Sequence, residues 1–328
     1  MNVISSAYIS CMESNESVII PPLWIDGSGI YDYLTVKAGD IIHFLVFSSI
    51  FMGMQGWGLV YVAAFIQGVE CSPGCIGIMF LLGFSVYNLN RKTDEKEDAV
   101  NHQDRYRFTK KYEKYLYTAA IGGCGFALAL GALYGLLTFL MVLLPLILGI
   151  LYSIPCLPPS TGYRRLKEIP VLKNLIVAIA WGIPLTFIPL FVTSTSVTLA
   201  TAVSLVYLSS FVFIASTLPD IRDIEGDKLA GIRTIPVVIG AERTMTLITG
   251  INLMVGTCAV IISAMYLTPV IVLVLAVSIL YTHISIRSFT RGEKKDIICD
   301  IMTDGQFIFI GILAYTLILL SGSIAIPG

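Results

Sequence analysis

The chain of 328 residues is 56% hydrophobic and only 13% charged, and its mean hydropathy is +0.83. A soluble domain of this size needs more charge and less apolar surface, so the composition excludes that class and indicates an integral membrane protein. The net charge of −1 carries little information, because the positions of the charges matter more than their sum.

Residues 1–40 are mixed in character and rich in turn formers, which favours a short cap or an interfacial segment. They lack the basic stretch and the compact apolar stretch of a secretory signal, so we expect no cleaved signal peptide. The first membrane span would then direct insertion itself. We predict that residues 41–328 form the transmembrane domain.

An α-helix needs about 20 apolar residues to cross a hydrocarbon core of ~30 Å. Nine segments approach or exceed this length, and we predict an all-α polytopic membrane protein, a bundle of about nine transmembrane helices. The segments are roughly 41–67, 74–90, 114–136, 138–155, 171–192, 197–219, 244–266, 269–287 and 304–326. Only Tyr134 and Gly135 divide the third segment from the fourth.

All 21 Lys and Arg residues fall on one side of these nine spans. They lie before the first span and after the second, fourth, sixth and eighth spans, whereas the alternate connections contain none. By the positive-inside rule this side is cytoplasmic. We therefore expect a multi-pass protein of the cell membrane with its N-terminus in the cytoplasm and its C-terminus outside.

The seven cysteines and three histidines match no metal-binding pattern. Cys71 and Cys75 lie close together in the segment ECSPGC. They are either free thiols or, if this loop faces an oxidising compartment, a disulfide. We expect the scattered cysteines to pack as small apolar side chains.

A first cluster of polar residues follows the second span, between Tyr87 and Arg107. Asn90, Asp94 and Asp98 stand four residues apart, which places them within an arc of roughly 80° on one helix face, about 6 Å from one to the next. Carboxylate and amide oxygens in such a row suit Mg²⁺, which usually binds one or two carboxylates together with substrate phosphates. The cluster therefore predicts half of a magnesium site.

A second acidic cluster, Asp220, Asp223 and Asp227, follows the sixth span and covers an arc of roughly 60° if the helix continues. Both clusters open to the same face of the membrane. Solvated helix ends are the competing interpretation, but acids at matching depth favour a binding site that needs a divalent cation or basic side chains. The basic candidates nearby are Arg105, Arg107, Arg165, Lys167 and Lys228.

A diphosphate held by magnesium on facing carboxylates becomes a good leaving group. Its departure from an allylic carbon leaves a resonance-stabilised carbocation, which must be protected from water until an acceptor arrives. A cavity lined with apolar and aromatic side chains excludes water and offers ring faces to the cation. The chain has 16 Phe, 16 Tyr and 3 Trp from which to build such a cavity, although most aromatic residues in membrane spans are simply packing.

These motifs resemble those of the UbiA superfamily of intramembrane prenyltransferases, from about residue 41 to the C-terminus. The resemblance is carried by N-x-x-x-D-x-x-x-D at residues 90–98, by D-x-x-x-D at residues 223–227 with Gly231 and Thr234-Ile235-Pro236 after it, and by Tyr152-Ser153 leading to Arg165-Leu166-Lys167. It implies nine helices around a central cavity with a cytoplasmic cap formed by the motif-bearing loops.

The resemblance also implies roles for individual residues. Asn90, Asp94, Asp98, Asp223 and Asp227 match the magnesium-diphosphate ligands, and the four acids among them are the expected catalytic residues. Asn101 and Arg105 match the Asn and Arg of the usual N-x-P-x-R-P tail of the first motif, and we assign Tyr152, Arg165, Lys167 and Asn174 to contact with diphosphate or acceptor. Gln103 and Tyr106 replace the prolines of that tail, which implies a looser cap and an altered acceptor preference.

We therefore expect a magnesium-dependent transferase that moves a polyprenyl group from its diphosphate to a lipophilic acceptor. The acceptor is an aromatic or quinone precursor or, alternatively, a glyceryl-ether phospholipid precursor, and the sequence singles out no acid as a base for a hydroxyl acceptor. The expected partners are the polyprenyl diphosphate donor, the acceptor and membrane lipid, with no nucleic acid. An ion-coupled secondary transporter, with paired acids at mid-depth, and an assembly scaffold are the readings from other classes.

Overall fold

The computed structural model describes residues 39–229, 231–291, 295 and 298–321. The chain divides into two units, Met1–His43 and Phe44–Gly328, and the second contains the long apolar helices. The segment predicted to form an N-terminal cap or interfacial element lies almost entirely outside the described residues, so its structure stays a prediction.

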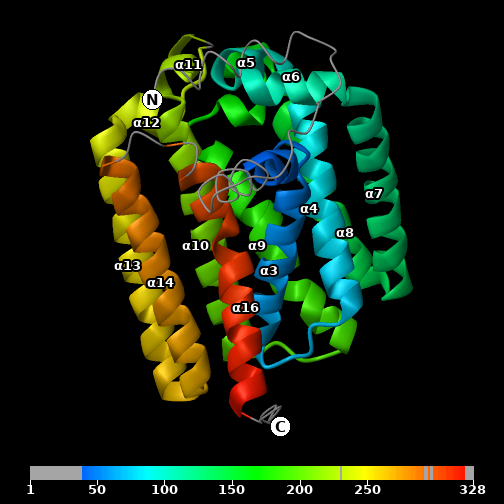
Figure 1. The fold of residues 1–328 in the computed structure, drawn as a ribbon, viewed down its shortest axis with the longest axis vertical. Coiled ribbons are helices and arrows are strands. Elements are labelled where there is room, and N and C mark those ends of the chain that lie inside the picture. The colour runs from blue at the N-terminus through cyan, green and yellow to red at the C-terminus, as the bar shows by residue number, and fades with distance from the viewer. Residues whose placement is uncertain (1–38, 230, 292–294, 296–297, 322–328) are drawn as a thin grey trace, which may run out of the picture. The chain divides into compact units, whose positions relative to one another are not determined.

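Within the described residues, nine helices are long and apolar enough to span a membrane, which confirms the predicted all-α polytopic architecture (Figure 1). They are α3 (Ile50–Gln67), α4 (Pro73–Thr93), α7 (Glu113–Leu133), α8 (Leu136–Ser153), α9 (Leu172–Thr193), α10 (Leu199–Arg222), α13 (Ala241–Tyr266), α14 (Pro269–Arg291) and the final span. The final span begins with a π-helix, η3 (Ile298–Thr303), and continues as α16 (Asp304–Ser321).

The ends of several helices follow from local chemistry. Ser72 caps α4 by accepting a hydrogen bond from the Cys75 N–H at 3.3 Å, and Pro73 occupies the first turn, where its missing N–H is tolerated. Gly135 separates α7 from α8 with a φ of 107°, a conformation that favours glycine. The predicted division of spans three and four at this position is confirmed.

The first span differs from the continuous helix predicted over 41–67, because it breaks at Ser48 and Ser49. Ser49 takes a left-handed conformation with a φ of 64°. The break is sustained by α4: Asn88 Nδ2 donates to the Ser48 carbonyl at 3.0 Å, and Arg91 Nη2 donates to the Val46 carbonyl at 3.0 Å. The carbonyl oxygens around the break therefore find side-chain donors on the neighbouring helix.

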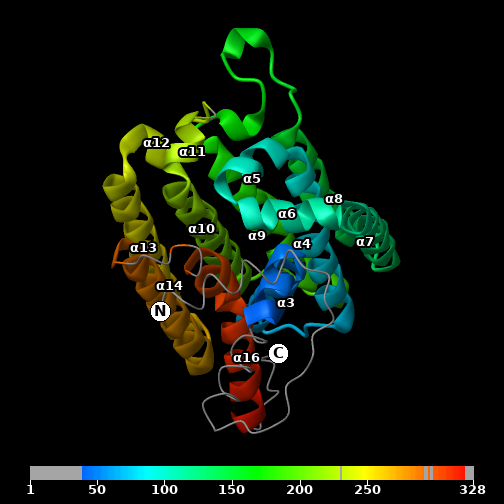
Figure 2. The ribbon, with the colours of Figure 1, turned by 45° about the horizontal axis from the view of Figure 1, so that its top comes forward.

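Four short helices lie at one end of the bundle, as Figure 1 shows and Figure 2 shows again with that end turned forward. They are α5 (Glu95–Asn101), α6 (Gln103–Lys111), α11 (Ile224–Leu229) and α12 (Ile235–Ile239), with the 3₁₀ turns η1 (Pro159–Thr161) and η2 (Leu166–Glu168) in the loop after α8. Gly226 of α11 approaches Asn101 of α5 so closely that a Cβ built there would lie 1.8 Å from Asn101 Oδ1. The loops after α4 and α10 thus pack on each other and form a cap.

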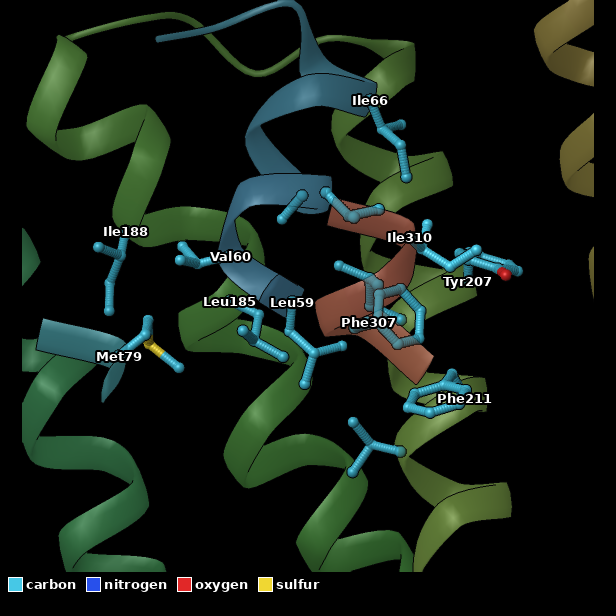
Figure 3. Close-up of a cluster of buried hydrophobic side chains, with 14 of the residues drawn as sticks. Leu59, Val60, Ile66, Met79, Leu185, Ile188, Tyr207, Phe211, Phe307 and Ile310 are labelled. Carbon is cyan, nitrogen blue, oxygen red and sulfur yellow. The ribbon is translucent and has the colours of Figure 1, made fainter. Parts of the chain in front are cut away.

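The core lies between the central helices, where Leu59, Leu185, Phe211 and Phe307 are buried together (Figure 3). The rings of Phe211 and Phe307 pack edge to face with centroids 4.4 Å apart. In the most apolar stretch of each helix, 61% of the residues of α3 are buried but only 22% of those of α7. Helix α3 is therefore central, and α7 has the large exposed apolar surface of a lipid-facing helix.

Close packing of α3 on α16 gives a test of this arrangement. A Cβ at Gly58 would lie 2.3 Å from the Phe307 carbonyl oxygen, whereas a Cβ at Gly122 on α7 would meet nothing within 4 Å. We expect Gly58→Val to destabilise the protein in detergent by about 1–3 kcal/mol relative to Gly122→Val, because the helices would have to move apart. Thermal unfolding of the two variants measures this difference, and equal midpoints would contradict the packing.

Candidate active site

A cavity of about 360 Å³ lies between the spanning helices and the cap. Its walls combine charged side chains from the cap and helix ends with the apolar and aromatic side chains of Phe51, Leu59, Trp181 and Phe211. The predicted site residues that line it are Asn90, Asp94, Asp98, Asn101, Arg105, Tyr152, Lys167, Asn174, Asp220, Asp223 and Asp227. Both acidic clusters therefore meet in one chamber.

Three predicted site residues do not line this cavity. Arg107 on α6 is exposed and lies 3.9 Å from the carboxylate of Asp104. Arg165 donates from Nε to Glu168 at 2.7 Å at the start of η2, and Lys228 is exposed on α11. Arg107 and Lys228 are exposed on the cap helices α6 and α11, and an ion pair with Glu168 holds Arg165 at the turn η2, so none of the three lines the cavity.

The spacing predicted that the first cluster lies on one continuous helix. The structure differs, because α4 ends and α5 begins at Asp94. The helical backbone hydrogen bonds nevertheless continue across the break. The Asp94 N–H donates to the Asn90 carbonyl and the Asp98 N–H donates to the Asp94 carbonyl, both at 2.9 Å. Lys167 donates to Asp94 at 2.5 Å, and Arg105 donates to Asp98 at 2.7 Å. Each of these acids therefore has a basic partner.

The second cluster is likewise interrupted, here at Asp223, where α10 ends. Asp220 is buried, and each of its carboxylate oxygens accepts a hydrogen bond, one from Lys173 at 2.5 Å and one from Asn174 at 3.0 Å. Asp223 receives Arg222 Nε at 2.9 Å. Asp227 differs from these acids, because its buried Oδ2 has no hydrogen-bond partner among the described residues.

The environments of Asp223 and Asp227 shift their pKa values in opposite directions. Burial alone would raise the pKa of Asp223, but hydrogen bonds and charge from His102 and Arg222 outweigh it and lower the pKa to about 2. Burial raises the pKa of Asp227 to about 6, with Lys173 opposing the shift and Asp220 and Asp223 adding to it. Without a bound cation, Asp227 is the acid of the pair that resists ionisation.

Several cavity residues were not predicted as site residues. Lys173 and Arg222 were considered only in the distribution of basic residues, and His102 only as one of three histidines. Lys173 is nevertheless the direct neighbour of the predicted Asn174. Asp300 and Asp304 of the final span also line the cavity. Their D-x-x-x-D spacing, the same as that of residues 223–227, is the sequence signal that could have found them.

Arg222 joins three parts of the chain at the cap end of the cavity. It donates to Asp223 at 2.9 Å and to Asp300 of the final span at 3.2 Å, and its Nη2 lies 3.0 Å from His102 Nε2. The loop after α4, the end of α10 and the π-helix are therefore held in one polar network.

The fold and the site together define a polytopic helical membrane protein with an internal chamber, charged at the capped end and apolar towards the membrane interior. Such a chamber suits an amphiphilic anion with a long apolar tail. Residues 56–312 match the model of the UbiA prenyltransferase family, and the chain belongs to that family. It is therefore an enzyme of the class that transfers prenyl groups.

The individual relatives have low sequence identity to this chain. Over 198 residues, 59% of this chain and 67% of the relative, the chain is 26% identical to digeranylgeranylglyceryl phosphate synthase of Natronomonas pharaonis. The structure of a UbiA homolog from Aeropyrum pernix K1 superposes with a TM-score of 0.63 at 16% identity, covering 83% of this chain and 98% of that one. A UbiA homolog from Archaeoglobus fulgidus bound to GPP and Mg²⁺ gives 0.59 at 17% identity, covering 83% and 99%. These two likenesses establish the fold.

The opposite pKa shifts predict opposite effects of two matched substitutions. The raised pKa of Asp227 means that its ionisation destabilises the folded protein as pH rises from about 4 to about 6, so at pH 7.5 in EDTA we expect Asp227→Asn to be more stable than wild type by on the order of 1–2 kcal/mol. The lowered pKa of Asp223 stabilises the folded protein above about pH 4, and Asp223→Asn should be less stable than wild type at pH 7.5.

Thermal unfolding in detergent at pH 7.5 and pH 4.5 measures both effects. The gain of Asp227→Asn should shrink at pH 4.5, where the native carboxyl is mostly protonated in the folded protein. A loss of stability for Asp227→Asn at pH 7.5 in EDTA would show that this carboxylate has a partner that the description of the site lacks.

Proposed function

We propose that this protein is a magnesium-dependent intramembrane prenyltransferase that moves a polyprenyl group, for example geranylgeranyl, from its diphosphate to a lipophilic acceptor. The observation that carries the proposal is the meeting of two aspartate motifs, from α4–α5 and α10–α11, in one cavity with apolar walls. The relative from Archaeoglobus fulgidus that was solved with GPP and Mg²⁺ supports the donor and the metal.

The donor atoms of the cavity fit Mg²⁺ bound together with a diphosphate. Among the described residues, no three Asp, Glu, His or Cys side chains converge as a ready-made metal cluster. Mg²⁺ does not need one, because it usually combines one or two carboxylates with phosphate oxygens and water. The unpartnered oxygen of Asp227 is a vacant hard ligand, and Asp94, Asp98, Asp223 and the amide oxygen of Asn90 complete the set that we propose would hold the metal.

Asp220 has a different role in this proposal. It belongs to the second cluster by sequence, but Lys173 and Asn174 already occupy its two oxygens. We therefore assign it to holding Lys173 and Asn174 at the cavity wall instead of binding metal. In that position Lys173 would present a partly buried positive charge to the diphosphate.

The residues of the chain support departure of the diphosphate as follows. When Mg²⁺ is bound, it neutralises charge that develops on the leaving oxygens. Lys167, Arg105 and Lys173 line the same end of the cavity and add fixed positive charge there as the allylic C1–O bond breaks. Towards the membrane interior, Trp181 and Phe211 exclude water and offer ring faces to the allylic cation.

Two acceptor classes fit the proposal at this level. The sequence does not distinguish an aromatic or quinone precursor, which reacts at carbon, from an acceptor that reacts through a hydroxyl group. The named relative from Natronomonas pharaonis is a digeranylgeranylglyceryl phosphate synthase, and this name supports a glyceryl-ether acceptor that reacts through a hydroxyl group. The family match favours either transferase over an ion-coupled transporter.

The test uses the purified protein with geranylgeranyl diphosphate, Mg²⁺ and acceptors of both classes. We expect transfer of the prenyl group with release of diphosphate, abolished by EDTA and lowered at least ~100-fold by Asp94→Ala or Asp223→Ala, because the metal-diphosphate complex loses its anchor. Glu242→Gln, a change on the exposed start of α13, is the control. Full activity of both Asp variants would refute the proposed site.

We also infer that the capped end of the bundle faces the cytoplasm, as the distribution of Lys and Arg predicts. Single-cysteine variants test this orientation. Cys156 lies exposed in the loop after α8, near the cap, and Thr195 lies exposed in the connection at the opposite end of α9. A membrane-impermeant maleimide added to intact cells should label Thr195→Cys and should reach Cys156 only after permeabilisation. The reverse pattern would invert the topology.

A further inference from the structure

The final membrane span contributes two carboxylates to the cavity, and neither of them belongs to the two aspartate motifs. Asp300 lies in the π-helix η3 and Asp304 begins α16, and both line the cavity. Asp300 already accepts a hydrogen bond from Arg222. Asp304 is therefore the carboxylate of this wall whose function the metal and diphosphate leave unexplained.

Asp304 also differs from the motif acids in its partners. Within the described part of the chain, no Lys, Arg or His lies within ion-pair distance of its carboxylate, whereas Asp94, Asp98, Asp220, Asp223 and Asp300 each have such a partner. Its hydrogen bond from Gln55 Nε2 is long, at 3.5 Å. One or more lone pairs of Asp304 are thus free to accept a hydrogen bond from a molecule in the cavity.

The backbone holds Asp304 in this position by two features. The π-helix, in which Thr303 Oγ1 also donates to the Ile298 carbonyl at 3.0 Å, inserts a wider turn before α16, and such turns occur frequently at functional sites. The close approach of Gly58 to Phe307 fixes α16 against α3. Gln55 and Asp304 each stand three residues before this contact, which places them opposite each other on the two helices.

We propose that Asp304 is the base for a hydroxyl acceptor, with Gln55 positioning its carboxylate; this inference rests on the proposed prenyl transfer. The acceptor oxygen forms a bond to the allylic C1 as the bond from C1 to the diphosphate oxygen breaks and its electron pair leaves with the diphosphate. The hydroxyl proton passes to the Asp304 carboxylate. The acceptor class is therefore an alcohol, and the name of the relative from Natronomonas pharaonis supports one of the glyceryl-ether lipid type.

The chemistry of attack distinguishes this acceptor from an aromatic acid. A hydroxyl oxygen becomes positively charged as it attacks carbon, so a neighbouring carboxylate that accepts its proton stabilises the transition state. An aromatic ring attacks through carbon and loses its proton in a later step, so it gains less from a base at the moment of attack.

The experiment compares wild-type protein with Asp304→Asn, Asp304→Glu, Gln55→Leu and the control Glu242→Gln. The donor is geranylgeranyl diphosphate with Mg²⁺, and the acceptors are geranylgeranylglyceryl phosphate and 4-hydroxybenzoate. We expect wild type to prenylate the alcohol, and Asp304→Asn to lower kcat for this transfer about 100-fold. Donor affinity should be unchanged, Asp304→Glu should recover part of the rate, and Gln55→Leu should have a smaller effect than Asp304→Asn.

The possible results separate this inference from the function on which it rests. Failure of wild type to prenylate either acceptor, at saturating donor and Mg²⁺, would count against the proposed function itself. Transfer to the aromatic acid alone would keep the function and overturn the hydroxyl acceptor. Wild-type kcat in Asp304→Asn, or an equal loss of donor affinity and rate, would overturn the role of Asp304 as base.

Discussion

Ion pairs between cavity acids and basic side chains hold the capped end of this bundle together. Each of three ion pairs joins two different helices or turns of the chain. They are Lys167–Asp94, Arg105–Asp98 and Lys173–Asp220. Charges removed from water at a membrane protein's interior are expensive unless they are paired and hydrogen-bonded. Moving one of these acids away from the cavity would leave its basic partner without a counter-charge. The pairs therefore fix the geometry of the chamber.

These pairs also prepare the cavity for an anion that arrives with its own cations. In the proposed reaction, a metal-bound diphosphate would bring positive charge to the carboxylates and negative charge to the lysines and arginines, so each partner of a pair could exchange one contact for another. Asp227, which has an unpartnered oxygen, needs no pair to be opened first. Arg222 donates hydrogen bonds to both Asp223 and Asp300, so it links the second aspartate motif to the final span.

Much of this structure could be predicted from the sequence, because hydropathy and charge distribution are local properties. They indicated nine spans and placed both acidic clusters at one end of the bundle. The helix breaks at Asp94 and Asp223 could not be predicted from four-residue spacing, since partners from other segments stabilise them. The packing of helices distant in sequence determines the ion pair of Lys173 with Asp220, the exposure of Arg107 and the contact of Asp304 with Gln55. No local sequence pattern contains this information.

In the proposed reaction, both aspartate motifs bind one diphosphate through magnesium. A structure of the protein with Mg²⁺ and a non-hydrolysable geranylgeranyl diphosphate analogue tests it most directly. We expect the diphosphate to lie, together with the metal, between Asp94 or Asp98 on one side and Asp223 or Asp227 on the other, with the prenyl chain running past Trp181 and Phe211. An analogue bound by one motif alone, or seated outside this cavity while the Lys167–Asp94 and Arg105–Asp98 pairs stay closed, would contradict it.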